Sequence, residues 1–65
     1  MTIKLFDPVE VIKDIPDKRL KTGMRGAVVE IYTKPTLGYE VEFDNIPVND
    51  LNIAALLPDQ IKKVE

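Results

Sequence analysis

The sequence predicts an all-β fold, in a single small domain that spans residues 1–65. The first observation is a β-branched run over residues 26–32, bounded by glycine on one side and proline on the other. The second is an alternating run over residues 38–44, which is typical of a strand with one buried and one solvated face. Hydrophobic residues make up 45% of the chain and charged residues 31%, which indicates a globular domain rather than disorder.

The first strand is predicted over residues 9–14, where β-branched and other apolar side chains are frequent. Pro8 and Pro16 bracket this segment. Proline is tolerated at strand starts, at edges and in turns, so we expect the strand to end before Pro16.

A polar excursion follows over residues 16–26, with Leu20 as its apolar anchor. Gly23 and Gly26 close it. Their spacing predicts a tight turn in which glycine supplies a positive φ.

The two central runs predict an antiparallel hairpin, because only the short connection 34–37 separates them. In the first run, Ala27, Val29 and Ile31 share one face, and Val28, Glu30 and Tyr32 share the other. In the second run, Tyr39, Val41 and Phe43 point inward, while Glu40 and Glu42 face water.

The last third of the chain leaves two alternatives open. Asp50 can cap a short helix over residues 51–57, or these residues can form a strand. The strand is favoured because the hairpin needs a neighbour that covers its edge. A single turn that begins at Pro58 and a closing strand over residues 61–64 complete the prediction.

Five such strands close most simply as a small barrel, in which one face of each strand fills a shared interior. The order is strand, long loop, central hairpin, fourth strand, one-turn 3-10 helix and fifth strand. This order resembles that of the SH3-like barrels, and we therefore predict a five-stranded SH3-like barrel.

Several motifs along the chain resemble those of one family of short bacterial proteins. They include Leu5-Phe6-Asp7, Asp14-Ile15-Pro16, Val28-Val29-Glu30, Tyr39-Glu40-Val41-Glu42-Phe43 and Leu57-Pro58. The family is the domain of unknown function numbered 4926, and the resemblance covers nearly the whole chain. It implies no catalytic residue, and it suggests an antitoxin- or immunity-type role in a bacterial two-gene pair. The chain departs from the family pattern at residues 44–50, which contain no glycine.

The residue inventory argues against catalysis. The chain has no histidine, cysteine, tryptophan or serine, so the usual nucleophiles, the proton shuttle and the soft metal ligands are missing. Two carboxylate pairs remain, Asp14 with Asp17 and Glu40 with Glu42. Acid–base work would require one pKa of a pair to be raised, and we interpret both pairs as solubilising charges. We expect a protein that is not an enzyme and that holds no cofactor.

Two further ligand patterns are weak. Oxygen atoms of Asp44, Asn45, Asn49 and Asp50 suit a hard cation, but their spacing matches no EF-hand loop. The two glycines at the end of the polar excursion lack the surrounding pattern of a phosphate-binding loop. We therefore predict no metal site and no phosphate site.

Charge is distributed unevenly along the chain. Residues 13–25 hold five basic and two acidic side chains, a net of +3, so the rest of a chain with net charge −2 carries −5. Solvated loops are one interpretation, and complementary poles that steer a partner or a second copy are the other. The candidate partner-binding residues are Lys18, Arg19, Lys21, Arg25 and Tyr32.

The leading hypothesis is a non-enzymatic protein-interaction module that docks another protein through the latter's acidic surface. The alternative is an RNA- or DNA-binding barrel of the KOW-like type, which would use the same loop, residues 18–25. The acidic total charge and the scarcity of aromatic residues for base stacking argue against it. For Tyr32, packing on the barrel and an exposed anchor remain alternatives.

Cellular location is predicted from what the sequence lacks. No segment reaches the roughly 18 apolar residues that a membrane span needs, and the first residues do not resemble a signal peptide. The absence of cysteine fits a reducing compartment. We expect a cytoplasmic protein without membrane contact; the sequence does not indicate an oligomeric state.

Overall fold

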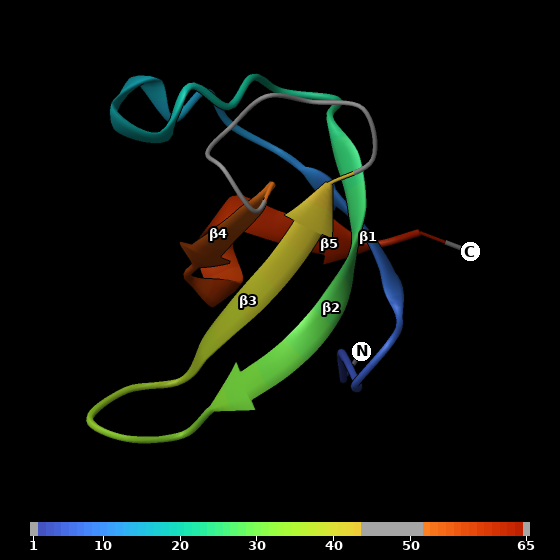
Figure 1. The fold of residues 1–65 in the computed structure, drawn as a ribbon, viewed down its shortest axis with the longest axis vertical. Helices are drawn as coiled ribbons and strands as arrows, with labels where there is room; N and C mark the ends of the chain where they lie inside the picture. The colour runs from blue at the N-terminus through green and yellow to red at the C-terminus, as the bar shows by residue number, and fades with distance from the viewer. Residues whose placement is uncertain (1, 44–51, 65) are drawn as a thin grey trace.

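The computed structural model describes residues 2–43 and 52–64, and within these ranges the fold is all-β. The elements are β1 (Pro8–Val11), η1 (Pro16–Lys18), β2 (Arg25–Tyr32), β3 (Gly38–Phe43), β4 (Ile53–Leu56), η2 (Pro58–Gln60) and β5 (Ile61–Lys63). The strands form one antiparallel sheet in the order β4-β3-β2-β1-β5 (Figure 1). The predicted barrel-like arrangement, with a one-turn 3-10 helix before the last strand, is confirmed. No helix in the described part of the chain has the length and apolar character that crossing a bilayer would take.

The sheet curls around β2, which pairs with β1 near its start and with β3 along its length. Its register with β3 shifts between Val28 and Glu30, and an irregularity of this kind bends a strand and increases its twist. The shift also breaks the predicted alternation. Val28 is buried, and the next side chain of β2 that packs against the core is Ile31, three positions later instead of two.

The core lies between the inward faces of the curled strands. The predicted inward side chains of β3, Tyr39, Val41 and Phe43, are all buried. The other buried hydrophobic residues are Val9, Val11, Ile15, Leu20, Val28, Ala54, Leu56 and Ile61. Every strand contributes at least one of these side chains, so the apolar interior holds the sheet in its curled form.

The first strand is shorter than predicted, and it begins one residue earlier. It ends at Val11, although the N–H of Ile12 still donates to the carbonyl oxygen of Gln60, at 2.9 Å, one residue beyond the last pair of β1 and β5. Residues 12–14 are exposed and belong to the following loop. The fifth strand also differs from the prediction, since it ends at Lys63; the predicted last residue of the third strand, Asp44, lies outside the described residues.

The ambiguous last third forms a strand. β4 pairs with β3 from Ile53 opposite Glu42 to Leu56 opposite Tyr39, so it covers the hairpin edge as the favoured alternative predicts. The predicted cap at Asp50 and the departure from the family pattern at residues 44–50 lie outside the described residues.

The two glycines of the polar excursion have different roles, and one prediction was wrong. Gly23 has a φ of +99° and is the expected turn glycine. Gly26 lies within β2, where a Cβ atom would come within 2.4 Å of the Glu42 carbonyl oxygen and 2.9 Å of Val41 Cγ1. Glycine is needed there because β3 approaches too closely for any side chain.

Replacing Gly26 by alanine should therefore destabilise the domain, by about 1–3 kcal/mol, because β2 and β3 must separate to admit a methyl group. The matched control is Gly38→Ala, since a Cβ at that position would meet only the Leu56 carbonyl oxygen at 3.6 Å. The control should stay within about 0.5 kcal/mol of the unaltered protein. Urea denaturation of the three proteins measures both values, and equal stability of the two variants would contradict the close approach.

Candidate partner-binding surface

The loop between β1 and β2 is folded back onto the barrel. Ile15 and Leu20 form an antiparallel bridge, with N–H to oxygen distances of 2.8 and 3.1 Å, and both side chains are buried. Gly23 donates its N–H to the carbonyl oxygen of Val11 at 2.8 Å, which closes the loop onto the end of β1. Leu20 is thus the anchor that the sequence predicts, and the loop has a defined shape.

A carboxylate clamp fastens the two sides of this loop. The backbone N–H and the hydroxyl of Thr22 both donate to Asp14 Oδ1, at 2.9 and 3.0 Å. These bonds stabilise the ionised carboxylate. The hydrogen bond from the Thr22 backbone, followed by the one from its hydroxyl, lowers the pKa of Asp14. Asp14 therefore has a structural role in the loop.

Three cations stand on the outside of the loop, and we call Lys18, Arg19 and Lys21 the basic triad. Lys18 ends η1, and Arg19 follows it in the left-handed conformation with a φ of +60°. The backbone N–H of Arg19 donates to the carbonyl oxygen of Pro16 at 3.0 Å. All three side chains are exposed, and none of them forms an ion pair with another described residue.

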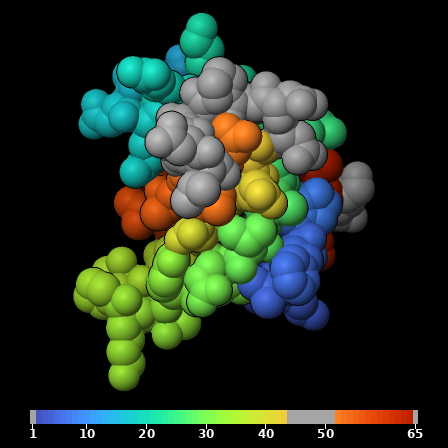
Figure 2. Space-filling view, viewed as in Figure 1, coloured from blue at the N-terminus to red at the C-terminus, as the bar shows by residue number. Residues whose placement is uncertain are grey.

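The other two bases of this region have acidic partners. Arg25 Nε lies 2.9 Å from Glu10 Oε1, and Lys13 Nζ lies 3.5 Å from Asp59 Oδ2. Within residues 13–25, the positive charge that no described acid pairs with therefore lies in the triad. Figure 2 shows the loop projecting from one end of the molecule.

Beneath the triad is a shallow depression of about 360 Å³, lined by Asp14, Pro16, Arg19, Leu20 and Lys21. Among the described residues that line it, the one carboxylate is Asp14, which accepts the two hydrogen bonds from Thr22. A negatively charged group that enters the depression would meet Arg19 and Lys21, so the site suits an anion.

Tyr32 does not lie with the triad. It ends β2, whereas Arg25 begins this strand, and eight residues of strand place them on the order of 20 Å apart. Tyr32 is 42% exposed, and its hydroxyl donates to the carboxylate of Glu40. This hydrogen bond raises the pKa of Tyr32. The structure thus favours the exposed interpretation of Tyr32 and separates it from the other candidate residues.

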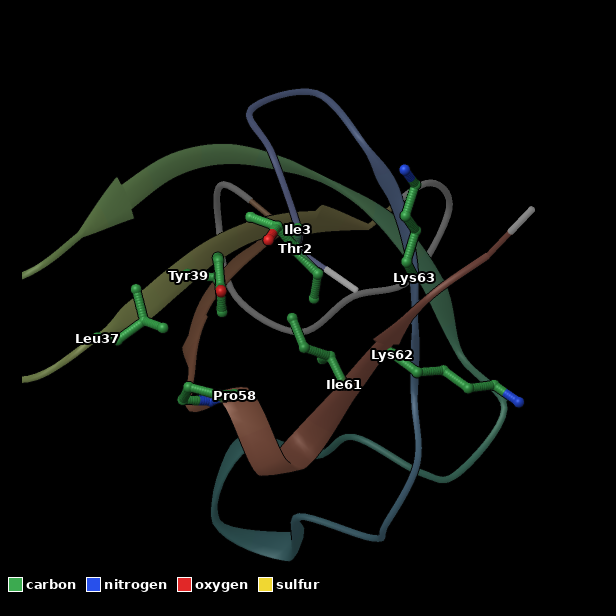
Figure 3. A pocket seen from close by; sticks show the side chains of 8 residues that line it. All are labelled: Thr2, Ile3, Leu37, Tyr39, Pro58, Ile61, Lys62 and Lys63. Atoms are coloured by element: carbon green, nitrogen blue, oxygen red, sulfur yellow. The ribbon is translucent and has the colours of Figure 1, made fainter.

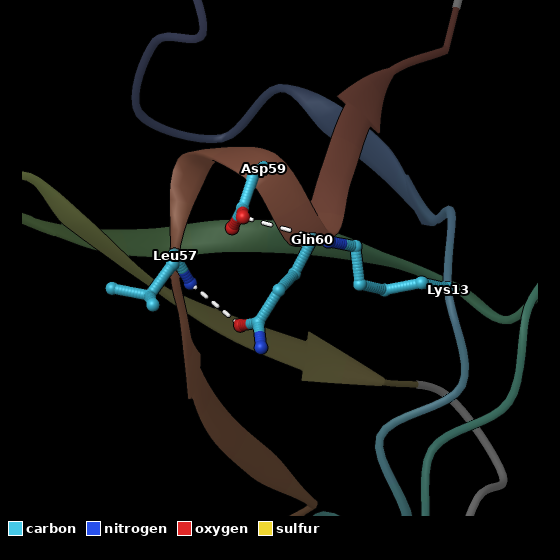
Figure 4. A network of polar contacts seen from close by, with 4 residues as sticks. All are labelled: Lys13, Leu57, Asp59 and Gln60. Atoms are coloured by element: carbon cyan, nitrogen blue, oxygen red, sulfur yellow. Dashed lines mark hydrogen bonds and ion pairs between the residues drawn. The ribbon is translucent and has the colours of Figure 1, made fainter.

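A second depression, of about 570 Å³, lies between the N-terminal segment, the connection of β2 and β3, η2 and β5; we call it the groove (Figure 3). It is lined by Thr2, Ile3, Leu37, Tyr39, Pro58, Ile61, Lys62 and Lys63. One wall is η2, whose shape is held by a hydrogen bond of 2.8 Å from the Leu57 N–H to Gln60 Oε1 (Figure 4). The sequence analysis did not single out this groove, because its walls come together only in the folded chain.

The structure adds little to the metal site and the carboxylate pairs considered from the sequence. Among residues 2–43 and 52–64, no three aspartate or glutamate side chains gather as a metal site would require. Glu30 of β2 and Glu40 of β3 stand directly opposite each other in the sheet. The hard-cation candidates Asp44, Asn45, Asn49 and Asp50 fall outside the described residues.

The Asp14 clamp predicts a pH effect with a definite sign. Because the folded-state pKa of Asp14 is lowered from the ordinary 3.8, the clamp stabilises the fold above pH 3.8, and this contribution is lost as pH falls through the lowered value.

The Thr22→Val substitution tests the clamp. It removes the hydroxyl donor but keeps the backbone N–H, so the pKa of Asp14 should rise only part of the way back to its ordinary value. NMR titration of the Asp14 carboxyl measures it, with Thr36→Val as the control that leaves it unchanged. Identical titration midpoints in the unaltered protein and in the Thr22→Val variant would refute the clamp.

Comparison with known proteins gives a family and adds no function. No curated protein and no solved structure matches the chain. A family model described as "Domain of unknown function (DUF4926)" matches residues 5–63. These residues include all five strands and the basic triad. The chain belongs to this family of domains of unknown function.

Proposed function

We propose that the protein is a non-enzymatic interaction module whose basic triad docks an acidic surface of another protein. The observation that supports this most directly is the presence of three cations without an ion-pair partner among the described residues, on a loop held in a defined shape. We place this role in the bacterial cytoplasm, with the antitoxin or immunity partner of a two-gene pair as its most specific form.

The rigidity of the loop supports a binding role. The bridge between Ile15 and Leu20 and the clamp between Asp14 and Thr22 order the backbone before any partner arrives. Ordering a flexible loop upon binding would cost free energy, and a preorganised loop avoids most of that cost. Only the exposed side chains of the triad then have to be immobilised by the partner.

The charge distribution favours an acidic protein as the partner. The triad concentrates positive charge at one end of a chain whose net charge is −2. Such a local field accelerates the encounter with a complementary surface. Three cations supply few contacts for a nucleic acid, because nucleic-acid binding relies on many phosphate contacts at once.

Nucleic acid is the second candidate, because the triad can also contact phosphate groups. Among the candidate binding residues, no aromatic side chain lies beside the triad to stack on bases. Tyr32 is the exposed aromatic of the predicted set, and it lies at the far end of β2. A nucleic acid held by this loop would therefore be bound through its backbone alone, with strong dependence on salt.

Reversing the charge of the triad should abolish partner binding and leave the fold intact. The variant replaces Lys18, Arg19 and Lys21 by glutamate, and the charge-matched control replaces Lys4, Lys34 and Lys62 by glutamate. The partner to be used is the product of the adjacent gene, measured by co-elution and by the melting temperature of the mixture. A partner at about 100 times its dissociation constant should stabilise the unaltered protein by about 2.7 kcal/mol.

The outcomes separate the two candidates. Co-elution that the triad variant loses and the control keeps supports the protein interface. Absence of co-elution and of a melting shift in the unaltered protein contradicts it. Triad-dependent retention of mixed-sequence oligonucleotides at about 50 mM salt, where phosphate contacts are strong, would favour nucleic acid instead.

A further inference from the structure

β5 stands at one edge of the sheet, with β1 as its neighbour. The N–H of Val64 donates to the carbonyl oxygen of Pro8 in β1, at 2.9 Å. At the other end of β5, the carbonyl oxygen of Gln60 accepts from the N–H of Ile12, also at 2.9 Å. In an antiparallel pair, every second residue bonds to the same neighbour. Lys63 lies one residue before Val64, and it therefore directs its N–H and its carbonyl oxygen away from β1.

The backbone of β5 is unpaired on this outer side. Neither the N–H nor the carbonyl oxygen of Lys63 forms a hydrogen bond with another described residue, and the same holds for the carbonyl oxygen of Ile61. We call these three groups the β5 edge. Unpaired backbone groups on an edge strand are a template on which a further strand can pair.

The groove runs along the β5 edge. Its lining includes Ile61, Lys62 and Lys63, which are all the residues of β5. Successive side chains of a strand point to opposite faces, so three consecutive residues border one depression where it reaches the edge of the strand. Figure 3 shows Leu37 and Pro58 across the groove from β5. A segment that pairs with the β5 edge would therefore lie in the groove.

The floor of the groove is apolar. Tyr39 and Ile61 are buried, and Ile3 packs against the same core. Leu37, 42% exposed, adds an apolar side chain to the lining. The volume of about 570 Å³ falls within the range of about 300–1,000 Å³ that is typical of ligand pockets. An added strand would place every second side chain in this groove, so those side chains should be apolar.

The lining of the groove includes two lysines and, among the described residues, no acid. Lys63 Nζ lies 3.6 Å from Asp7, whose carboxylate also accepts a backbone N–H at 2.8 Å. Lys62 Nζ lies 4.0 Å from Glu10, whose carboxylate is also 2.9 Å from Arg25 Nε. Each lysine thus shares its acid with a second donor. Because an ammonium group has three N–H donors, both lysines can pair with a further carboxylate.

Two more lysines lie on the segments that form the groove. Lys4 directly follows Ile3, and Lys34 belongs to the connection that supplies Leu37. Both side chains are exposed, and neither forms an ion pair with another described residue. Lysines at a sheet edge discourage pairing with a second copy of that edge, whereas they attract an acidic segment. The charge of this region therefore favours an acidic partner over a second copy.

We propose that the β5 edge and the groove bind an extended acidic segment of another protein, which adds to the sheet as a strand. Its backbone pairs with Lys63 and Ile61, its apolar side chains enter the groove, and its carboxylates lie on the outer face beside Lys62. Backbone hydrogen bonds supply affinity in this mode of recognition, and the alternate side chains supply specificity. No residue of the basic triad lines the groove, so this site is separate from the one in the proposed function.

A short synthetic peptide tests the proposal, with glutamate alternating with valine and phenylalanine and with both ends blocked. Added to the isotope-labelled full chain, it should shift the amide signals of Ile61 and Lys63, with a dissociation constant of about 1 mM or tighter. Hydrogen exchange of the Lys63 amide should slow, because its N–H gains an acceptor. The same peptide with lysine in place of glutamate should bind about tenfold more weakly or worse.

Strand addition has a signature of its own. Alternate residues of a strand direct their N–H groups to opposite edges, so two peptides methylated at alternate backbone nitrogens differ in which edge they block. One of them should lose about tenfold or more in affinity, and the other should bind like the unmethylated peptide.

Variants of the protein locate the site. Leu37→Asn should weaken binding of the acidic peptide, and the matched control is Ile12→Asn, which removes an apolar side chain of nearly equal exposure, 41%. Lys62→Glu should weaken binding about fivefold or more, because an attractive cross-strand pair becomes a repulsive one. The triad charge-reversal variant should bind the peptide like the unaltered protein.

Four results would overturn the proposal. The first is the absence of shifts at β5 with the acidic peptide at about 2 mM, twice the weakest expected dissociation constant. The second is equal affinity of the two methylated peptides, which would indicate a groove that holds side chains without strand addition. The third is peptide binding that the triad variant loses, which would place the peptide on the triad. The fourth is a concentration-dependent shift of the Lys63 amide in the free protein, which would favour a second copy as the occupant. Failure of the peptide to bind at β5 leaves co-elution through the basic triad unaffected.

Discussion

The bend in β2 is the constraint on which the rest of the structure depends. β2 is shared by β1 and β3, and its register shift between Val28 and Glu30 turns one continuous sheet into a curled one. The close contact of Gly26 with β3 keeps the two central strands together at the start of β2. Without both features, the inward faces of β1 and β4 would not meet over a common core.

The same strand determines where the two candidate surfaces lie. The loop with the basic triad enters β2 at Arg25, and the central hairpin, which supplies Leu37 to the groove, leaves it at Tyr32. The basic loop and the connection of the central hairpin therefore lie at opposite ends of β2 (Figure 1).

The sequence predicts the strands well because apolar and polar side chains alternate along a strand as its buried and exposed faces do. Tyr39, Val41 and Phe43 follow this rule, and all three are buried. It fails where the fold depends on distances between strands. The shift after Val28 and the close contact at Gly26 exist only once β3 is in place. Tyr32 was grouped with the basic residues although the length of β2, at about 3.3 Å per residue, places it far from them.

Two exposed side chains stand at positions of backbone strain. Apart from glycine, the described residues with positive φ are Phe6, Arg19 and Asn52, and asparagine is an ordinary residue in that conformation. Phe6 and Arg19 are the unusual ones, and each costs about 1–2 kcal/mol of a stability that is commonly only about 5–15 kcal/mol. One is an exposed ring in the turn before β1, and the other belongs to the basic triad. Glycine or asparagine would relieve both positions, so this chain keeps an aromatic and a guanidinium side chain at solvent-facing positions where the backbone alone would favour other residues.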